Sequence, residues 1–468
     1  MTAFGYRARP VAIAGALALI AAGCSSFRDQ LLEPQQPSII TPEVVNSPTA
    51  ADALRLGALS RLKTATAGTS GTETMWTMGG LLADEWKSGD TFSQRVETDQ
   101  RVIQASNADV ASFYSAEHRA RGAARDAIDA LQKYQLPNAS IAQMYWVLGL
   151  VEEHLAEAFC NGVPFGTIVD GIPQYTDPLT NEQAFNLALA HIDSGLALAT
   201  AADTFATGTK YNLLVTKGRI LIQLGKFTEA AAAVASVPTS YRWYLTWATS
   251  TSPAADNPVW SFNSSQKRWV VGDSFDVTGV IKNALPFASA KDPRVPVTGT
   301  SLNSSLKVAF DNFTQFVSQG VWGRSDWAPV ISGIDARLYE AEAKLQANDI
   351  AGMMQILNDL RAAPQALSNV YKTPVMAALA TPATKDAAID LYFREKAFWV
   401  FSRGQRLGDL RRLIRQYNRS QENVFPTGTF HKNGNPPYGT DVNFPVATTS
   451  TIDEGANPNF HGCIDRKA

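Results

Sequence analysis

The chain has 468 residues, 45% of them hydrophobic, and a formal net charge of −2. A chain of this length and composition can bury a large core. The balanced charge, without a strong basic block, argues against binding to nucleic acid.

The first residues have the composition of a targeting segment. Arg7 and Arg9 precede an apolar run at 11–22, which is too short to cross a bilayer as a helix. Cys24 follows almost at once, so we expect residues 1–23 to be a lipoprotein signal peptide and Cys24 to be acylated. A plain secretory signal with an incidental cysteine is the alternative.

Residues 24–50 are expected to form a flexible tether, because this stretch is rich in Ser, Pro and Gln and has no sustained period. Residues 51–468 are expected to form a single domain. Within it, apolar residues recur at helical spacing. The helices predicted in this way lie at 51–63, 72–86, 110–134, 140–159, 181–199 and 385–416. The segment 160–180, rich in Gly and Pro, is expected to be a loop.

Two further segments each predict a pair of short helices. Residues 211–237 contain Gly225-Lys226 as the turn, and residues 335–361 repeat the same plan. In the first pair, the small residue Gly218 in the middle of one helix would let the other approach closely. This spacing matches the tetratricopeptide pattern.

The segment between the two pairs, residues 240–332, has a different composition. It is rich in Trp, Ser, Asn, Gly and Pro, and helical periodicity fades, with short strands expected at 259–262, 269–271 and 328–331. The expected fold is therefore mainly α. It is a tetratricopeptide-like helical-repeat scaffold with a large irregular, loop-rich insertion and few short strands.

Aromatic side chains on loops are the candidates for contact with a ligand, because flat rings stack on the apolar faces of sugars while polar neighbours bind hydroxyls. Four tryptophans in polar loop company are expected to be exposed and to bind ligand: Trp86, Trp269, Trp322 and Trp327. Packing beneath a loop is the alternative for each. The core is expected to hold Trp76, Trp146 and Trp399, which lie in apolar helical runs.

No motif for catalysis or metal binding is recognisable: the 5 histidines lack HExxH spacing, and no GxSxG elbow occurs. Asp84-Glu85 and Glu152-Glu153 suggest solvated helix faces rather than paired glycosidase acids, because adjacent helical residues point about 100° apart. Arg406 can pair with Asp409, three residues on, in a structural role. We therefore expect no enzyme activity, no cofactor and no metal-binding residues of a recognisable motif; a structural metal ion stays an open alternative.

Of the 3 cysteines, Cys160 and Cys463 remain once Cys24 carries lipid. Two thiols in an exported protein are more often paired than free. We expect a Cys160–Cys463 disulfide, which would tie the C-terminal end to the first half of the chain.

Several segments resemble the motifs of one family. Residues 404–412 (GQRLGDLRR) are similar to the Gly-x-Arg-x-x-Asp-Leu-x-Arg motif of the SusD/RagB nutrient-uptake lipoproteins, and residues 394–399 resemble the helix that precedes it. Other matches to the family, in order along the chain, are Asp292-Pro293-Arg294, residues 338–343, residues 357–361, Phe444-Pro445 and Asn457-Pro458-Asn459.

The resemblance implies a function as well as a fold. Such proteins lie on the outer face of the outer membrane, held there by lipid alone, and they bind an oligosaccharide or a peptide. They deliver it to a SusC-like TonB-dependent transporter, which is the expected partner. The identity of the ligand does not transfer. An envelope helical-repeat scaffold without a small ligand, and a secreted hydrolase, are the alternatives.

Overall fold

The computed structural model describes residues 45–169, 172–249, 252, 255–276, 278–298, 308–432, 434–446 and 457–468. Ser47–Ala468 form one compact unit. The expected signal peptide, Cys24 and the tether as far as residue 44 lie outside the described residues. The last residues of the expected tether are helical, because Ser47 caps a helix that begins at Pro48.

The unit is mainly helical, as the apolar periodicity predicts. The helices are α3 (Pro48–Ala67), α4 (Met75–Leu82), α5 (Ser93–Gln100), α6 (Ala108–Lys133), α7 (Asn138–Ala158), α8 (Asn181–Leu198), α9 (Thr204–Gln223), α10 (Phe227–Val234), α11 (Pro258–Trp260), η3 (Ser261–Ser265), α12 (Gly333–Gln346), α13 (Ile350–Arg361), α14 (Lys385–Trp399), α15 (Arg406–Arg415) and η4 (Gln421–Asn423).

The described strands are short and join in antiparallel pairs. The pairs are β1 (Trp86–Ser88) with β7 (Trp269–Val271), β2 (Val163–Pro164) with β5 (Pro178–Leu179), β3 (Thr167–Val169) with β4 (Ile172–Gln174), β6 (Arg242–Leu245) with β12 (Ala328–Ser332), β8 (Phe275–Asp276) with β9 (Gly279–Val280), and β10 (Val297–Thr298) with β11 (Ser318–Gln319).

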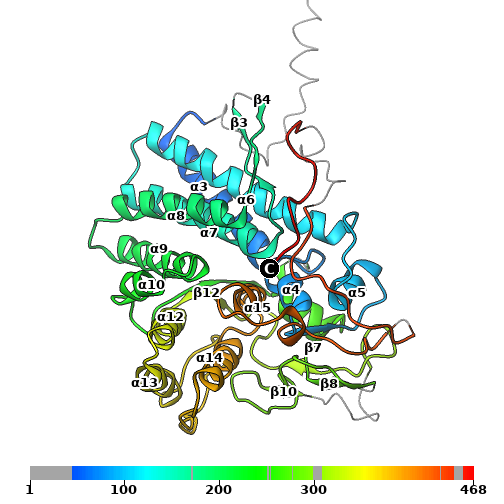
Figure 1. Ribbon diagram of the computed structural model, residues 1–468. Coiled ribbons are helices and arrows are strands. Elements are labelled where there is room, and N and C mark those ends of the chain that lie inside the picture. Colours follow the sequence, from blue (N-terminus) through cyan, green and yellow to red (C-terminus); the bar gives the residue numbers. More distant parts are fainter. Residues whose placement is uncertain are drawn as a thin grey trace, which may run out of the picture. The chain divides into compact units, whose positions relative to one another are not determined.

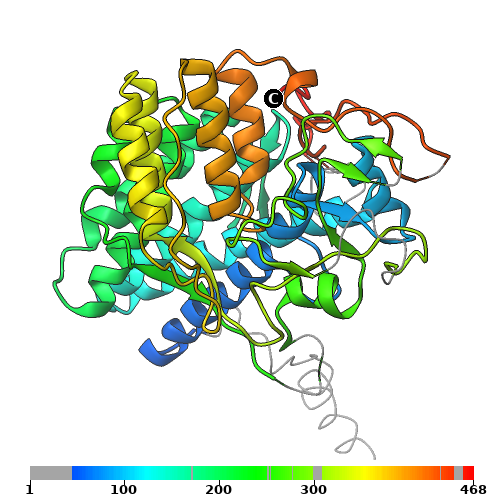
Figure 2. The same ribbon diagram turned by 90° about the horizontal axis from the view of Figure 1, so that it is seen from below.

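The helices pack as successive neighbours. α6 lies between α3 and α7, and α7 packs on α8 and α9. Figure 1 shows α8, α9, α10, α12, α13 and α14 following one another around one side of the unit, while β7, β8 and β10 lie on the other side. Figure 2 shows the same division from below, with helices side by side and loops with short strands beyond them. The expected helical scaffold and loop-rich part are thus separate regions.

The two tetratricopeptide-like pairs are confirmed as α9–α10 and α12–α13. α10 packs directly on α12, so the repeat is continuous in space although a long insertion interrupts it in sequence. Gly218 on α9 lets that helix approach both of the others: a Cβ there would lie 2.6 Å from Cγ1 of Val234 on α10 and 3.0 Å from Tyr339 on α12. The small residue has the role expected of it.

The insertion leaves and re-enters the scaffold at one place, because β6 at its start pairs with β12 at its end. The strands expected at 269–271 and 328–331 are present as β7 and β12. The strand expected at 259–262 is wrong: this stretch is a helical turn, α11 and η3, begun by Asn257, whose side chain accepts the N–H of Val259.

Two other expectations about local structure need correction. Residues 160–180 are not a plain loop, because the pairs β2–β5 and β3–β4 form there. Residues 385–416 are not one helical segment, because a break after Trp399 separates α14 from α15. Gly404 in this break has φ +69, a left-handed conformation that favours glycine.

The acidic pairs expected on solvated faces are buried instead, which corrects that interpretation. Asp84 receives two hydrogen bonds from Arg406, at 2.7 and 2.8 Å. Arg406 therefore does not pair with Asp409, which instead accepts from Lys396 and Arg412 at 2.7 Å each. Ion pairing across the fold offsets the cost of burying these charges, which would be several kcal/mol for each unpaired ion.

The second acidic pair is engaged in the same way. Glu152 accepts from Arg121 at 2.9 Å, and Glu153 lies 2.8 Å from Arg219. Each guanidinium comes from another helix, α6 for Arg121 and α9 for Arg219. These carboxylates join neighbouring helices and are not placed to act on a substrate.

The expected disulfide between Cys160 and Cys463 is present. It holds the C-terminal segment against the end of α7, where Ile464 also donates its N–H to the carbonyl of Asn161 at 2.8 Å. No described helix is both long enough and apolar enough to span a bilayer.

Candidate functional site

The structure separates the four candidate tryptophans. The expected exposure is wrong for Trp86, Trp269 and Trp322, which are all buried, whereas Trp327 is half-buried. Trp327 stacks on the exposed Tyr244 with ring centroids 4.9 Å apart. Trp76, Trp146 and Trp399 are in the core, as expected.

Each buried ring has a packing partner that explains its position. Trp86 donates from Nε1 to Oγ of Ser402 at 3.1 Å. Trp269 stacks on Phe262 with centroids 5.4 Å apart, and Trp322 donates to the carbonyl of Leu367 at 3.2 Å. Indole N–H groups with buried acceptors are typical of structural tryptophans. A stacking contact with a ligand requires an accessible ring face, so these three rings cannot provide one in this conformation.

The polar loop residues beside Trp86 do gather at a surface site, which we call the aromatic loop site. Its pocket of about 410 Å³ is lined by residues from three distant segments: Asp90, Thr91, Val96, Asp311, Phe313, His431, Lys432, Gly434 and Asn435. The loop before β7 adds a fourth segment with Arg268.

Backbone contacts hold these segments together. Gly89 donates its N–H to the carbonyl of Arg268 at 2.8 Å and accepts from the N–H of Asp311 at 2.9 Å. A Cβ at Gly89 would lie 2.5 Å from Cβ of Ala309 and 3.0 Å from Val270. Glycine at this position therefore lets three segments of the chain, around residues 89, 268 and 310, pack this closely.

The charged groups of the site neutralise one another. Arg268 contacts both carboxylate oxygens of Asp90, at 2.7 and 2.8 Å, and Arg95 pairs with the same carboxylate. Lys432 bridges the carbonyl of Asp90 at 2.7 Å and the carboxylate of Asp311 at 2.6 Å. Fixed pairs of this kind pre-organise the loops.

The ionisation of the two carboxylates follows from these contacts. Burial acts to raise the pKa of Asp90, but hydrogen bonds from Arg268 and Arg95 outweigh it and lower that pKa below its ordinary value. Burial also acts to raise the pKa of Asp311, but hydrogen bonds from Lys432 and Thr314 outweigh it and lower that pKa below its ordinary value. Both groups are therefore anionic at neutral pH.

The exposed part of the site is aromatic. Phe92, Phe310 and Phe313 are 49%, 43% and 52% exposed. The guanidinium of Arg268 lies 4.8 Å from the ring centroid of Phe92 and 3.9 Å from that of Phe310, so it holds both rings in place. Exposed aromatic rings beside pre-organised polar groups can bind a ligand that has both apolar faces and hydroxyl groups.

Phe92, Phe310 and Phe313 are not among the ligand-binding residues expected from the sequence. One sequence pattern could have identified Phe313. It lies among Asp311, Asn312 and Thr314, residue types that favour a turn, and a turn would place its ring toward solvent. Among the described residues, no group of three His, Cys, Asp or Glu side chains is arranged to hold a metal ion.

No protein-family model and no curated protein matches the sequence. Solved structures do match, and they define the class of the fold: the chain has the fold of SusD-like proteins. The expected fold class is therefore confirmed.

Three of these structures illustrate the likeness. A SusD/RagB family protein from Bacteroides thetaiotaomicron is 13% identical, with a TM-score of 0.60 over 88% of this chain and 95% of the other. A SusD superfamily protein from Bacteroides fragilis is 14% identical, with a TM-score of 0.60 over 89% and 99%. A SusD-like carbohydrate-binding protein from Bacteroides fragilis is 12% identical, with a TM-score of 0.56 over 91% and 95%.

Proposed function

We propose that this chain is an outer-membrane lipoprotein of the SusD/RagB family that captures an oligosaccharide and delivers it to a SusC-like TonB-dependent transporter. The observation that carries the binding part of the proposal is the aromatic loop site. The exposed ring of Phe313 lines its pocket of about 410 Å³, and the exposed rings of Phe92 and Phe310 lie beside it against Arg268. Some structures with this fold are described as carbohydrate-binding proteins, which supports a glycan as the ligand.

The aromatic loop site suits binding more than catalysis. The carboxylates in it are tied to Arg268, Arg95 and Lys432, so neither Asp90 nor Asp311 is available as a protonated general acid at neutral pH. Rings that stack and side chains that are already paired offer a ligand a fixed surface. This favours a binding protein that has no catalytic step.

The sequence supports the location. The apolar run at 11–22 and Cys24 suit acylation at the cell envelope, and residues 24–46 would link the lipid to the compact unit. The delivery step is inferred from the resemblance to SusD/RagB proteins. A peptide ligand remains the competing outcome for the same site, since aromatic rings also bind peptide side chains.

Two experiments test the proposal. The purified protein is applied to glycan and peptide arrays, and we expect binding to oligosaccharides; binding to peptides alone would contradict the glycan assignment. Separately, the protein carrying a C-terminal tag is purified in detergent from membranes of its native host. A co-purifying outer-membrane barrel with a TonB-dependent plug is expected, and recovery of the protein alone would contradict delivery to such a transporter.

A further inference from the structure

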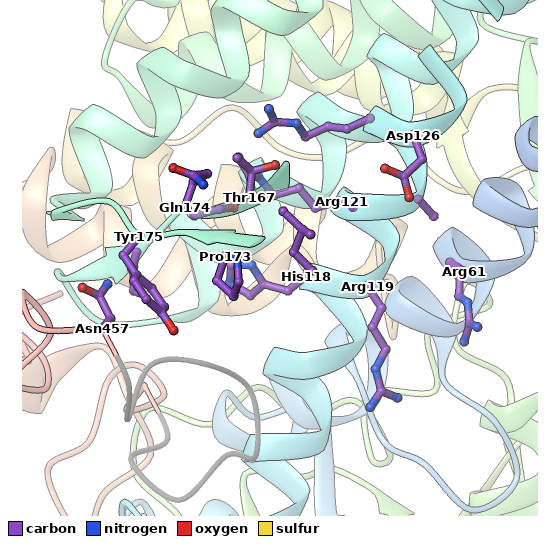
Figure 3. Close-up of a pocket in the computed structure, with 16 residues that line it drawn as sticks. Arg61, His118, Arg119, Arg121, Asp126, Thr167, Pro173, Gln174, Tyr175 and Asn457 are labelled. Atoms are coloured by element: carbon purple, nitrogen blue, oxygen red, sulfur yellow. Dashed lines mark hydrogen bonds between the residues drawn. The ribbon is translucent and has the colours of Figure 1, made fainter. Parts of the chain in front are cut away.

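A second hollow lies on another part of the fold, along α6. Two adjoining pockets of about 450 and 400 Å³ share Arg61 and Arg119 in their linings. One is bounded by the β3–β4 hairpin and Asn457, the other by the end of α3. We call the combined hollow the α6 groove. Figure 3 shows its first part, with Arg61 and Asp126 at one end and Tyr175 and Asn457 at the other.

The floor of the α6 groove is one face of the helix. The lining residues from α6 include a set that recurs every three or four positions and is mostly small: Ala108, Ala111, Ser112, Ser115, Ala116, Arg119, Gly122, Ala123 and Asp126. His118, Arg121 and Arg125 from the same helix also line the first part of the groove. This stretch of helix is about 27 Å long at 1.5 Å per residue. A floor of small side chains between two walls leaves room for an extended chain molecule.

The groove is positively charged. Among the described residues, no ion pair joins Arg61, Arg119 or Arg125 to an acidic side chain, whereas Arg121 is paired with Glu152. His118 adds no charge, because burial and the nearby Arg121 lower its pKa to about 3. Within the described part of the chain, these three guanidinium groups without an ion pair outnumber Asp126, the acidic residue in the lining of the groove.

The remaining lining is that of a site for a hydroxyl-rich ligand. The part near α3 carries hydroxyl groups from Thr64, Thr72, Ser106, Ser112 and Ser115. At the other end the ring of Tyr175 is 38% exposed beside Pro173. Hydroxyl donors, a ring for stacking and guanidinium groups for carboxylates together match a sugar chain that bears acid groups.

We propose that the α6 groove binds an acidic oligosaccharide, with Arg61, Arg119 and Arg125 contacting its carboxylate or sulfate groups. The proposal rests on the proposed glycan-binding function and adds a second site to it. No residue is shared between the linings of the α6 groove and the aromatic loop site. The two sites can therefore be tested separately.

The test is calorimetric titration of the purified full-length protein in detergent. The probes are galacturonate and mannuronate oligomers, with neutral glucose and xylose oligomers of the same length as comparators and poly-glutamate as the peptide probe. The variant is Arg119→Gln/Arg125→Gln. The matched control is Lys210→Gln/Lys226→Gln, which removes the same charge from exposed positions that line neither site.

An acidic oligomer should bind the unmodified protein, and the arginine variant should bind it roughly tenfold more weakly, as loss of hydrogen bonds to charged groups implies. The lysine control should match the unmodified protein, and added salt should weaken binding. Thermal melts should be nearly unchanged, because neither arginine forms an ion pair with an acidic side chain that the structure describes.

Equal affinity in the arginine variant, or binding of poly-glutamate in place of the acidic oligomers, overturns the proposal. Binding of neutral oligomers alone also overturns it, while leaving the proposed glycan-binding function intact. Absence of binding to every glycan probe contradicts both the α6 groove proposal and the proposed glycan-binding function.

Discussion

Phe92, Phe310 and Phe313 differ from the tryptophans near them in what each ring touches. The tryptophans donate to, or stack on, buried groups such as Ser402 and Phe262, whereas the phenylalanines keep about half of their surface open. The distinction between structural and ligand-facing aromatics therefore lies in the partners of each ring. Truncation to alanine should therefore reduce stability at the buried tryptophans, and it should reduce ligand binding but not stability at the exposed phenylalanines.

We predict that Trp86→Ala lowers the free energy of unfolding by about 3–5 kcal/mol, because it empties a buried position. Phe92→Ala, six residues on, should leave the melting temperature nearly unchanged. Thermal and urea melts of the two variants measure this. A Phe92→Ala variant that melts as early as Trp86→Ala would show that Phe92 is a core residue.

Glu85 is a buried carboxyl with a pH-dependent effect on stability. Burial, outweighing the hydrogen bond from the N–H of Ser402, raises its pKa to about 8 from an ordinary 4.5. Between these values the unfolded chain ionises Glu85 while the folded protein keeps it protonated. The contribution of Glu85 to stability is thus complete below pH 4.5 and is lost as pH rises through 8.

Glu85→Gln removes this titration, while its side-chain carbonyl can still accept from Ser402. We predict that the variant becomes progressively more stable relative to the unmodified protein from about pH 4.5 to about 8, with a constant difference above that range. Urea melts across the range test this. Parallel stability curves for the two proteins would contradict the raised pKa.

At the scale of elements, helix-to-helix contacts depend on a few small residues. Gly218→Ala should destabilise the protein by about 1–3 kcal/mol, since a Cβ there would lie 2.6 Å from Val234 and overpack α9 against α10. Gly57→Ala in α3 is the control: a Cβ there meets nothing within 4 Å, so the change should stabilise by about 0.5–1 kcal/mol. Changes of the same sign in both variants would contradict the close approach.

The disulfide is a contact between elements distant in sequence. Removing it by Cys160→Ser/Cys463→Ser should cost up to about 6 kcal/mol in the chain-entropy model for a loop this long, and less in practice because Asn161 still bonds to Ile464 and Asp465. Counting thiols on the denatured, unreduced protein should find no free cysteine. Two free thiols would show that the pair does not form.

The elements were predictable where structure follows local sequence. α6, α7 and α8 carry apolar residues at helical spacing, and Gly218 fits between α9 and α10 as the tetratricopeptide pattern requires. The Cys160–Cys463 pair could be predicted by counting thiols. These features depend on residues close in sequence or on composition.

The site was harder to predict, because it depends on pairing between distant segments. Trp86 and Trp269 stand in polar company, but the strands β1 and β7 pair and bury both, and Lys87 and Ser88 are buried with them. Asp84 and Glu152 were expected on solvated faces but are buried. Their ion-pair partners, Arg406 and Arg121, lie on other helices, so the local sequence does not reveal the pairs that make burial possible. Local polarity therefore gave no measure of exposure.

At the scale of the whole molecule, the compact unit is divided between a helical scaffold and a loop-rich part that carries the aromatic loop site (Figure 1). β6 and β12 connect the two, since they pin both ends of the insertion at the scaffold. Changes to the rings of the loop site should therefore alter binding without disturbing the repeat helices.

Anchoring is a property of the whole molecule as well. We predict that Cys24→Ser releases the protein from membranes, because we expect the lipid on this residue to hold the protein there. Fractionation of cells expressing the two forms tests this. Retention of the Cys24→Ser protein in the outer membrane would show that another anchor exists.

The most direct measurement is calorimetric titration of an array-selected oligosaccharide into the Phe92→Ala/Phe310→Ala/Phe313→Ala variant, with Phe205→Ala as the control. Phe205 is 42% exposed, comparable to the three site rings, but lies on α9. Each ring that stacks on a sugar contributes about 1–3 kcal/mol, so the triple variant should bind at least about five- to 150-fold more weakly while melting normally. The control should bind as the unmodified protein does. Unchanged affinity in a folded triple variant would contradict the assignment of the aromatic loop site as the place where this protein binds its ligand.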